Sequence, residues 1–494
     1  MTETTPSLDI GAADLVIRGA TVVTADSQSA QDVVVKDGKI AGLLAAGSPI
    51  VSKRTIDASG KVLIPGCIDP HTHIWWPFDD QVSCDTFDSA SKPALISGTT
   101  TVVDFLPTSR DDDPIITTAP RIREAASRFV CDYSFHPILT SSGPAVLEAV
   151  GEFVEMGLAS FKMYTTYPDT RVDDGDIWVL MQAIHEAGGL AGFHAESDDL
   201  IGSATGRLLS SGRTAVRYFP ESRPPLSEVI SIGTVARFAQ ELGCEVYIYH
   251  VSSGLPAVRE ARERAVNVMA ETCTHYLTLS RSLYSGPEAW RYVMSPPLPH
   301  DSLQRDLWQA LAQREIQSVA SDHCAYSREQ KHYRDDSFEI PGGLPGLSAR
   351  VPLLLSEGVN AGKITMQDFV YATSTGIAKS LGIYPGKGSI TVGADADLVI
   401  VDLDMPWTFD DTEGGSDFSP YAYRSGQGRP IMTIRRGEVV WDGETFTGEP
   451  GSGMLVRQRP LATQAPDGRS LKRDGVTSGE TSTPSRQATL RVRT

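Results

Sequence analysis

The sequence predicts an α/β fold: a TIM (β/α)8 barrel joined to a smaller β-sandwich domain that the N- and C-terminal segments build together. Two observations lead to this prediction. Eight short apolar runs alternate with helical stretches through the middle of the chain, and short strand-like runs separated by turns occupy both ends. A chain of 494 residues is also too long for one compact core of ordinary size.

The N-terminal segment contains four short runs typical of strands, with Asp37-Gly38 as a hairpin turn between the last two. These runs cover residues 15–18, 20–24, 31–36 and 39–44. Similar runs return at residues 397–402 and in the hairpin-like TIRRGEVVWDGETF of residues 433–446. The two ends of the chain are therefore expected to complete one β domain.

The eight apolar runs of the middle segment predict the eight barrel strands. In chain order they are LIPGCIDPHTH, TTTVVDFL, DYSFHPIL, LASFKMY, LAGFHAE, EVYIYHVSS, NVMAETCTHY and IQSVASDHC. Most runs are followed by a helical candidate, such as residues 174–187 or 226–242. Eight βα units of this size are the number that a TIM barrel requires.

The C-terminal residues have a different composition, rich in Ser, Thr, Pro, Arg and Gln, which buries too little apolar area to become ordered. We expect a flexible tail there. The expected boundaries are 1–62 for the N-terminal part of the β domain, 63–390 for the catalytic barrel, 391–455 for the C-terminal part of the β domain and 456–494 for the tail.

Composition excludes several classes of function. No apolar run approaches the roughly 18 residues of a membrane span, and the first residues lack a secretory signal, so a cytoplasmic location without membrane contact is expected. The six cysteines form no C-x-x-C pair, which argues against a disulfide framework. A net charge of −18 disfavours nucleic acid as a partner.

Polar residues at the ends of the predicted strands indicate a metal site, because TIM-barrel active sites lie at the carboxyl ends of the strands. Taken singly, an H-x-H is more often accidental and a strand histidine is more often part of the core. A lysine inside a buried strand needs a reason, because its charge is costly to desolvate. Jointly they predict a metal centre, whose candidate ligands are His71, His73, Lys162, His194, His250 and Asp322.

The motifs around these residues resemble the hydantoinase and dihydropyrimidinase branch of the amidohydrolase superfamily, with allantoinases next closest. The resemblance covers about residues 12 to 457. It is carried by DPHTHIWWPF, SGTTTVVDF, SFKMYTTY, YIYHVSS, YVMSPPLP, GLPGLSARVPLLLSEGV, YPGKGSITVGADADLVIVD and GSGMLVRQRP. It implies an enzyme that hydrolyses the cyclic amide bond of a hydantoin or dihydropyrimidine to an N-carbamoyl amino acid, and a homodimer or homotetramer.

The resemblance also implies a role for each ligand. Lys162 would react with carbon dioxide to become N6-carboxylysine and bridge two divalent ions, zinc before manganese or iron. His71, His73 and Asp322 would hold one ion, and His194 and His250 the other. Asp322 would also transfer the proton during catalysis.

Further residues match substrate-binding positions of the family. Tyr167 corresponds to a tyrosine that supports the oxyanion, and Ser295 to a residue that holds the imide edge of the ring. Tyr164 and Arg171 match positions that border the substituent of the ring. Arg171 either faces solvent or reaches the pocket, where it would favour an acidic substituent.

Two departures keep other functions open. Gly342 stands where the branch usually has asparagine, and ETCTHYL from Glu271 looks closer to allantoinases, so an allantoinase or another cyclic ureide hydrolase is the alternative. A catalytically silent scaffold of the same fold is a third hypothesis, although no ligand position is missing. The thiol of Cys324 is a weaker nucleophile candidate than a metal-activated water.

Overall fold

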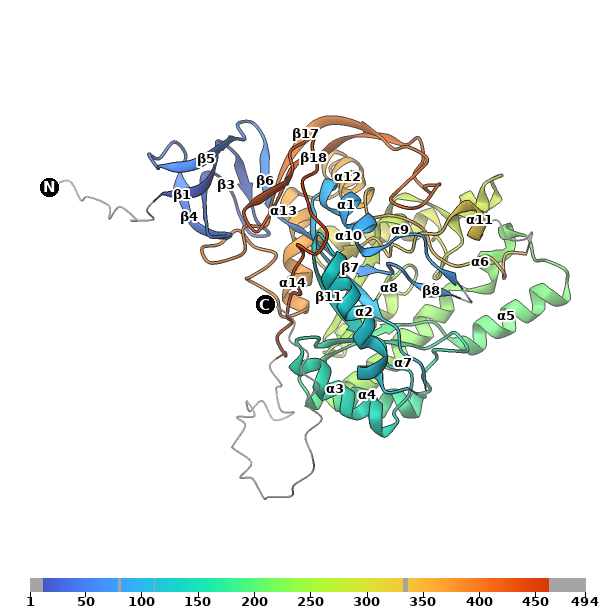
Figure 1. Cartoon of the computed structure of the whole chain (residues 1–494). Coiled ribbons are helices and arrows are strands. Elements are labelled where there is room, and N and C mark those ends of the chain that lie inside the picture. Colours follow the sequence, from blue (N-terminus) through green and yellow to red (C-terminus); the bar gives the residue numbers. More distant parts are fainter. Residues whose placement is uncertain (1–11, 79–80, 111, 332–335, 462–494) are drawn as a thin grey trace, which may run out of the picture.

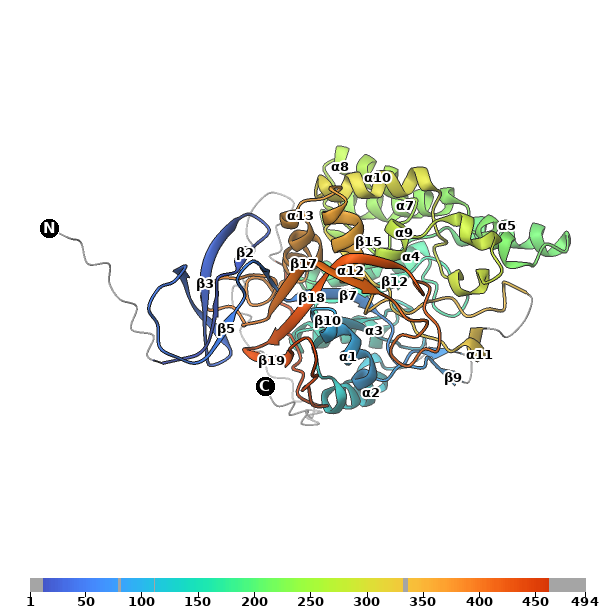
Figure 2. The same ribbon diagram turned by 90° about the horizontal axis from the view of Figure 1, so that it is seen from above.

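The structure is a computed structural model that describes residues 12–78, 81–110, 112–331 and 336–461. It confirms the predicted fold class, a (β/α)8 barrel beside a smaller β domain (Figure 1). Seen from above, the strands of the N-terminal segment lie at one side of the molecule, and β17 (Leu398–Thr408) and β18 (Ser425–Arg435) run between them and the barrel (Figure 2).

Eight parallel strands form the barrel in chain order, one within each predicted run. They are β7 (Cys67–Thr72), β10 (Thr99–Leu106), β11 (Asp132–Pro137), β12 (Ser160–Tyr164), β13 (Leu190–His194), β14 (Val246–Ile248), β15 (Val268–Cys273) and β16 (Ser318–Ala320). Parallel bridges from Ile138 to Lys162 and from Thr72 to His323 connect the two groups of strands. The ring of strands therefore closes.

Helices surround the barrel and connect its strands. The α-helices are α1 (Phe87–Ile96), α2 (Pro114–Arg128), α3 (Pro144–Glu155), α4 (Asp174–Glu186), α5 (Asp198–Ser210), α6 (Phe219–Ser222), α7 (Pro225–Leu242), α8 (Leu255–Glu263), α9 (Thr274–Thr278), α10 (Asp301–Ala312), α11 (Arg328–Lys331), α12 (Arg350–Leu353), α13 (Met366–Val370) and α14 (Gly376–Ser380). Short 3-10 or π-helical turns are η1 (Val216–Tyr218), η2 (Arg281–Ser285), η3 (Ala289–Tyr292), η4 (Leu354–Asn360) and η5 (Tyr371–Thr375).

Capping residues account for the two helices predicted most closely from the sequence. Helix α4 begins where the side chain of Asp173 accepts a hydrogen bond from the backbone N–H of Asp176. Helix α7 begins with Pro225 in its first turn and ends at Gly243, whose φ of 65° lies in the left-handed region that favours glycine. Both helices agree with their predicted ranges to within a residue at each end.

The small domain is a nine-stranded sheet to which both ends of the chain contribute. Its strands are β1 (Ala13–Arg18), β2 (Thr21–Val23), β3 (Gln28–Lys36), β4 (Lys39–Ala45), β5 (Ser52–Asp57), β6 (Val62–Pro65), β17 (Leu398–Thr408), β18 (Ser425–Arg435) and β19 (Glu438–Trp441). Strand β6 pairs antiparallel with β17, which joins the N-terminal strands to the C-terminal ones. Their buried side chains, including Leu15, Val33, Leu63 and Leu398, share one core.

A single glycine links the small domain to the barrel. Gly66 lies between β6 and β7, and a Cβ atom there would meet the Thr100 hydroxyl at 2.1 Å. Its backbone N–H donates to the carbonyl of Asp397, at 2.7 Å. The chain thus passes directly from the small sheet into the strand that carries the H-x-H motif. A short hairpin of β8 (Pro77–Phe78) and β9 (Gln81–Val82) follows that motif.

Two further expectations agree with the structure. None of the helices in the described ranges is long and apolar enough to cross a membrane. All six cysteines are free thiols, as their scattered spacing predicts.

The first residues of the predicted tail, 456–461, are packed against the barrel. Residues 456–461 cross the N-terminal ends of three barrel strands, where the N–H of Leu461 donates to the carbonyl of Gly188 at 2.8 Å. Gln458 is buried, and its Oε1 accepts from the N–H of Ala159 at 2.9 Å. Val456 and Leu461 also pack against the core, but two apolar residues in so short a segment produce no recognisable pattern. The rest of the predicted tail, 462–494, lies outside the described residues.

Replacing Gln458 with alanine should lower the free energy of unfolding by about 1–3 kcal/mol, because the buried N–H of Ala159 would lose its acceptor. The measurement is denaturant unfolding followed by circular dichroism. Arg459→Ala, which changes an exposed side chain in the same segment, is the control. Equal stability of the two variants would contradict a structural role for this segment.

Candidate metal centre and active site

The six predicted ligands meet at the carboxyl ends of the barrel strands. His71 lies in β7 and His73 directly follows it, and Lys162 and His194 lie in β12 and β13. His250 and Asp322 follow β14 and β16 by two residues each. All six residues are largely buried. The strand order therefore brings together residues that are up to 251 positions apart (71 to 322) in the sequence.

His71, His73 and Asp322 form the first half of the site. The two Nε2 atoms lie 3.2 Å apart, and Asp322 Oδ1 lies 3.1 Å from the Nε2 of His71 and 3.5 Å from that of His73. Ligands at about 2.0–2.1 Å from a tetrahedral zinc are separated from one another by about 3.4 Å. These three side chains therefore have the spacing of ligands to one ion.

A hydrogen bond with Glu271 determines which ring nitrogen of His71 carries the lone pair that can bind a metal. His71 Nδ1 donates to Oε1 of Glu271 at 2.7 Å, which leaves Nε2 unprotonated. Burial lowers the pKa of His71 and of His73 well below the usual range, so both rings are neutral at pH 7. Neutral imidazoles with converging lone pairs are the form that binds a metal.

His194 and His250 form the second half. Their ring centroids lie 4.4 Å apart, and burial keeps the pKa of both well below the usual range. His194 Nε2 donates to Oε2 of Glu196 at 2.7 Å, so its Nδ1 carries the lone pair. The backbone N–H of His250 donates to Glu271, at 3.1 Å. Glu271 thereby contacts both halves of the site.

Lys162 lies among these histidines. Its Nζ is 3.0 Å from Nε2 of His71 and 4.0 Å from the centre of the Phe105 ring. The nearby charge of Lys162 contributes to the low pKa of all four histidines. Burial in turn lowers the pKa of Lys162. Its pKa of about 8 leaves a larger fraction of the amine neutral at pH 7 than in an exposed lysine.

Three functional residues have left-handed backbone conformations. The φ angles are 75° at Tyr167, 38° at His250 and 50° at Asp322. Residues with a side chain occupy this region rarely, at a cost of about 1–3 kcal/mol each. The fold therefore holds these residues in place against their local preference.

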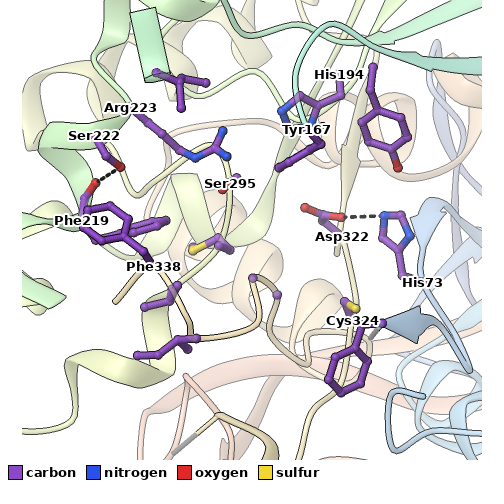
Figure 3. A pocket seen from close by; sticks show the side chains of 18 of the residues that line it. His73, Tyr167, His194, Phe219, Ser222, Arg223, Ser295, Asp322, Cys324 and Phe338 are labelled. Atoms are coloured by element: carbon purple, nitrogen blue, oxygen red, sulfur yellow. Dashed lines mark hydrogen bonds and ion pairs between the residues drawn. The ribbon is translucent and has the colours of Figure 1, made fainter. Parts of the chain in front are cut away.

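Four of the six candidate ligands line a pocket of about 560 Å³ (Figure 3). Aromatic side chains form much of its wall: Trp76, Phe78, Phe219 and Phe338. His73, His194, His250 and Asp322 reach it from the floor. Predicted substrate residues also line it, namely Tyr164, Tyr167, Ser295 and Gly342. A small cyclic molecule could therefore contact these side chains and the metal ligands together.

Comparison with known proteins assigns the chain to a family. Residues 62–440 match the amidohydrolase family. The chain belongs to the amidohydrolase family. It is 36% identical over 452 residues to the D-hydantoinase of Geobacillus stearothermophilus, covering 90% of this chain and 96% of that one. It is 34% identical to a D-phenylhydantoinase of Escherichia coli strain SE11, covering 90% of this chain and 98% of the other.

A solved structure extends the comparison to the fold. The crystal structure of dihydropyrimidinase from Brevibacillus agri NCHU1002 superimposes with a TM-score of 0.88 at 34% identity, covering 90% of this chain and 99% of that chain. The predicted place in the hydantoinase and dihydropyrimidinase branch of the amidohydrolase superfamily is thus confirmed.

Tyr167 and Ser295 line the same pocket in this amidohydrolase. Burial raises the pKa of Tyr167 to about 12, and the charge of Arg223 and the nearby Ser295 hydroxyl act in the opposite direction. The phenol is therefore protonated at neutral pH and able to donate a hydrogen bond toward the pocket.

Arg171 is the one predicted substrate residue that the structure does not bring into the pocket. Its Nη1 is 2.9 Å from Oδ2 of Asp198, and its side chain is 41% exposed. It lines a separate surface cleft with Asp173 and Asp174. The backbone N–H of Arg171 donates to the carbonyl of Tyr167, so the chain makes a turn between these two residues. In this structure the Arg171 side chain therefore lies in the solvent-facing position, and its role toward a substrate stays a prediction.

Close packing does not explain the glycine at residue 342. A Cβ atom at Gly342 would approach only the Met294 backbone, at 3.8 Å.

Lys331 is a buried lysine between two loops of the pocket. Its Nζ donates to the carbonyls of Val293 and Gly343, at 2.9 and 2.5 Å. Burial lowers the pKa of Lys331 to about 7. Lys331 thus ties together the two loops that carry Ser295 and Gly342.

Sequence reasoning missed Glu196, Arg223, Glu271 and Lys331. An H-x-E pattern at His194 and an acidic residue inside the buried run NVMAETCTHY were signals for the two glutamates. Nothing in the local pattern distinguished Arg223 or Lys331 from surface cations.

Cys324 lines the pocket beside Asp322 (Figure 3). Burial raises the pKa of its thiol to about 12. Since the thiolate is the nucleophilic form, the structure agrees with the expectation that Cys324 does not attack the substrate.

Proposed function

We propose that this chain opens the ring of a hydantoin or dihydropyrimidine by hydrolysing its cyclic amide bond, giving an N-carbamoyl amino acid. The observation that carries the proposal is the convergence of six candidate ligand side chains at the carboxyl ends of the barrel strands. Four of them line a pocket whose wall includes several aromatic side chains. The relatives named D-hydantoinase, D-phenylhydantoinase and dihydropyrimidinase support the same substrate class.

The donor set fits two divalent ions, with zinc first and manganese or iron as alternatives. Four neutral imidazoles and one carboxylate are ligands that suit zinc, and the spacing of His71, His73 and Asp322 matches one ion. His194 and His250 would hold the second. When bound, two such ions would acidify water and polarise the scissile carbonyl.

Lys162 is the group that we expect to bridge the ions. Carbon dioxide would add to its neutral amine with release of a proton, converting the amine into a carbamate that carries one negative charge. The burial that lowers the pKa of Lys162 supports this reaction, because only the unprotonated nitrogen attacks carbon dioxide. The product is N6-carboxylysine, and its two oxygens would provide one ligand to each ion.

The remaining residues would move protons and hold the ring. The Asp322 carboxylate would accept a proton from the attacking water and deliver it to the departing ring nitrogen. The Tyr167 hydroxyl would donate a hydrogen bond to the oxyanion that develops on the carbonyl oxygen. Ser295, its neighbour, would hold the imide edge of the ring.

The other hypotheses receive less support. The names of the relatives favour hydantoins and dihydropyrimidines over the allantoin alternative that Gly342 and ETCTHYL suggested. A silent scaffold would not need the complete set of six ligands, all of which lie at one place. The homodimer or homotetramer and the cytoplasmic location stay predictions from the sequence.

A substrate panel tests the proposed function directly. The zinc-loaded protein, prepared in bicarbonate buffer, should open hydantoin or dihydrouracil faster than allantoin, followed by loss of ring absorbance and by mass spectrometry of the product. If the protein opened the ring of allantoin and of no other substrate in the panel, it would be an allantoinase, which is the alternative hypothesis. No ring opening by protein that holds two zinc ions would contradict the proposal.

Substituent preference should not depend on Arg171. Because its guanidinium pairs with Asp198 outside the pocket, Arg171→Phe should leave the ratio of kcat/KM for phenylhydantoin to that for a carboxyalkyl hydantoin within about twofold of the parent. Trp76→Ala, which removes an aromatic wall, should lower the same ratio by about tenfold. A large change of this ratio in the Arg171 variant would show that the Arg171 side chain contacts the substituent of the substrate.

A further inference from the structure

Arg223 occupies a position between the metal ligands and the pocket. It follows α6 and precedes Pro224 and Pro225, and a residue before proline is restricted to extended backbone, with φ −125° and ψ 76° here. Its side chain is only 11% exposed. In Figure 3 its guanidinium points toward Tyr167 and Ser295. The segment between α6 and α7 thus places the positive charge of Arg223 beside the candidate metal site.

The guanidinium of Arg223 binds Glu196 directly. Its Nη1 pairs with the same carboxylate oxygen, Oε2, that accepts the Nε2–H of His194. The backbone N–H of Glu196 donates to Oγ1 of Thr165 at 2.9 Å, so the main chain is fixed as well. With its side chain only 1% exposed, Glu196 depends on Arg223 for charge compensation.

The face of the same guanidinium supports Tyr167. Arg223 Cζ lies 5.2 Å from the centre of the Tyr167 ring, within the range of a cation–π contact. That ring lies 5.0 Å from the His194 ring. One side chain therefore touches both the partner of a proposed metal ligand and the proposed oxyanion residue.

We propose that Arg223 is a positioning residue for the second half of the metal centre. It holds Glu196 where the carboxylate accepts the Nε2–H of His194, so that Nδ1 keeps the lone pair that faces the ion. It also holds the Tyr167 ring at the wall of the pocket. This inference rests on the binuclear centre of the proposed function and concerns residues outside the six ligands.

Arg223→Met, which keeps the length of the side chain without its charge, tests the proposal. The apo-protein is titrated with zinc in bicarbonate buffer against a chromophoric chelator. We expect the affinity for one of the two ions to fall by about 10- to 100-fold, as when other outer partners of metal ligands are removed, while the other ion binds as in the parent. Arg223→Lys should recover part of the loss, and circular dichroism checks that both variants fold.

A double variant separates the route through Glu196 from a general effect. Glu196→Gln alone should weaken the same ion, and Arg223→Met in the Glu196→Gln background should cause no further loss of zinc affinity. Arg217→Met, an exposed arginine of the same segment, is the matched control and should bind two ions as the parent does. Parent-like affinity for both ions in Arg223→Met would overturn the proposal, as would additive losses in the double variant.

The same zinc titration distinguishes a failure of this inference from a failure of the proposed function. A parent protein that binds fewer than two zinc ions would contradict the binuclear centre itself. A parent that binds two ions, together with an Arg223→Met variant that also binds two equally well, would contradict only the role of Arg223.

Discussion

Replacing Lys162 with alanine should lower kcat/KM for ring opening by at least about 10³-fold, well beyond the 10- to 100-fold effect of an outer partner. The variant loses the only side chain proposed to bridge the two halves of the site. Zinc content should fall with activity, as measured by inductively coupled plasma mass spectrometry. A short carboxylic acid such as propionate, added in solution, should restore part of the activity by occupying the place of the carbamate.

Lys162→Arg distinguishes the carbamate from a requirement for positive charge. Arginine keeps the cation but cannot form the carbamate under these conditions, so its loss of activity should match that of the alanine variant. An alanine variant that keeps two zinc ions and parental activity would remove the carbamate from the mechanism.

Asp322→Asn should reduce kcat by about 10²- to 10⁴-fold, because an amide cannot carry the proton from water to the ring nitrogen. The variant should fold normally, since asparagine tolerates the left-handed backbone that φ 50° imposes at this position. Steady-state kinetics on the best hydantoin of the panel gives the effect, and thermal unfolding checks the fold.

The control for this variant is Asp199→Asn, an exposed carboxylate at the start of α5 that should behave as the parent. If Asp322→Asn turned over substrate within a factor of about ten of the parent, proton transfer would have to be assigned to another group.

The fold and the meeting of the candidate ligands at one place could be predicted from the sequence, because both depend on local patterns. Each barrel strand is a short apolar run, and each candidate ligand lies in its strand or just after it. Because the carboxyl ends of all eight strands lie at the same end of a TIM barrel, the candidate ligands meet there. Glu196 and Arg223 depend on a pairing across 27 residues, and Lys331 on carbonyls of two separate loops. Such pairings follow from packing, which a single sequence does not display.

Two features of the structure did not follow from the sequence, for similar physical reasons. Arg171 aligns with a pocket position of related enzymes, but a nearby acid, Asp198, offers its guanidinium a partner on the outer side of the loop. The packed segment around Gln458 has only the partly buried Val456 and Leu461 as core contacts, and hydrogen bonds to strand ends fix its position. In both places a polar contact with a distant part of the chain decides the outcome.

The left-handed backbone at Tyr167, His250 and Asp322 has a consequence for engineering this enzyme. Glycine adopts such angles without a steric penalty, so glycine variants at these positions would relax local strain while destroying the chemistry. Screening variants for heat resistance alone would therefore risk retaining inactive proteins with changes at the catalytic rim. Selection for robustness has to be combined with selection for turnover, because at these three positions the two properties oppose each other.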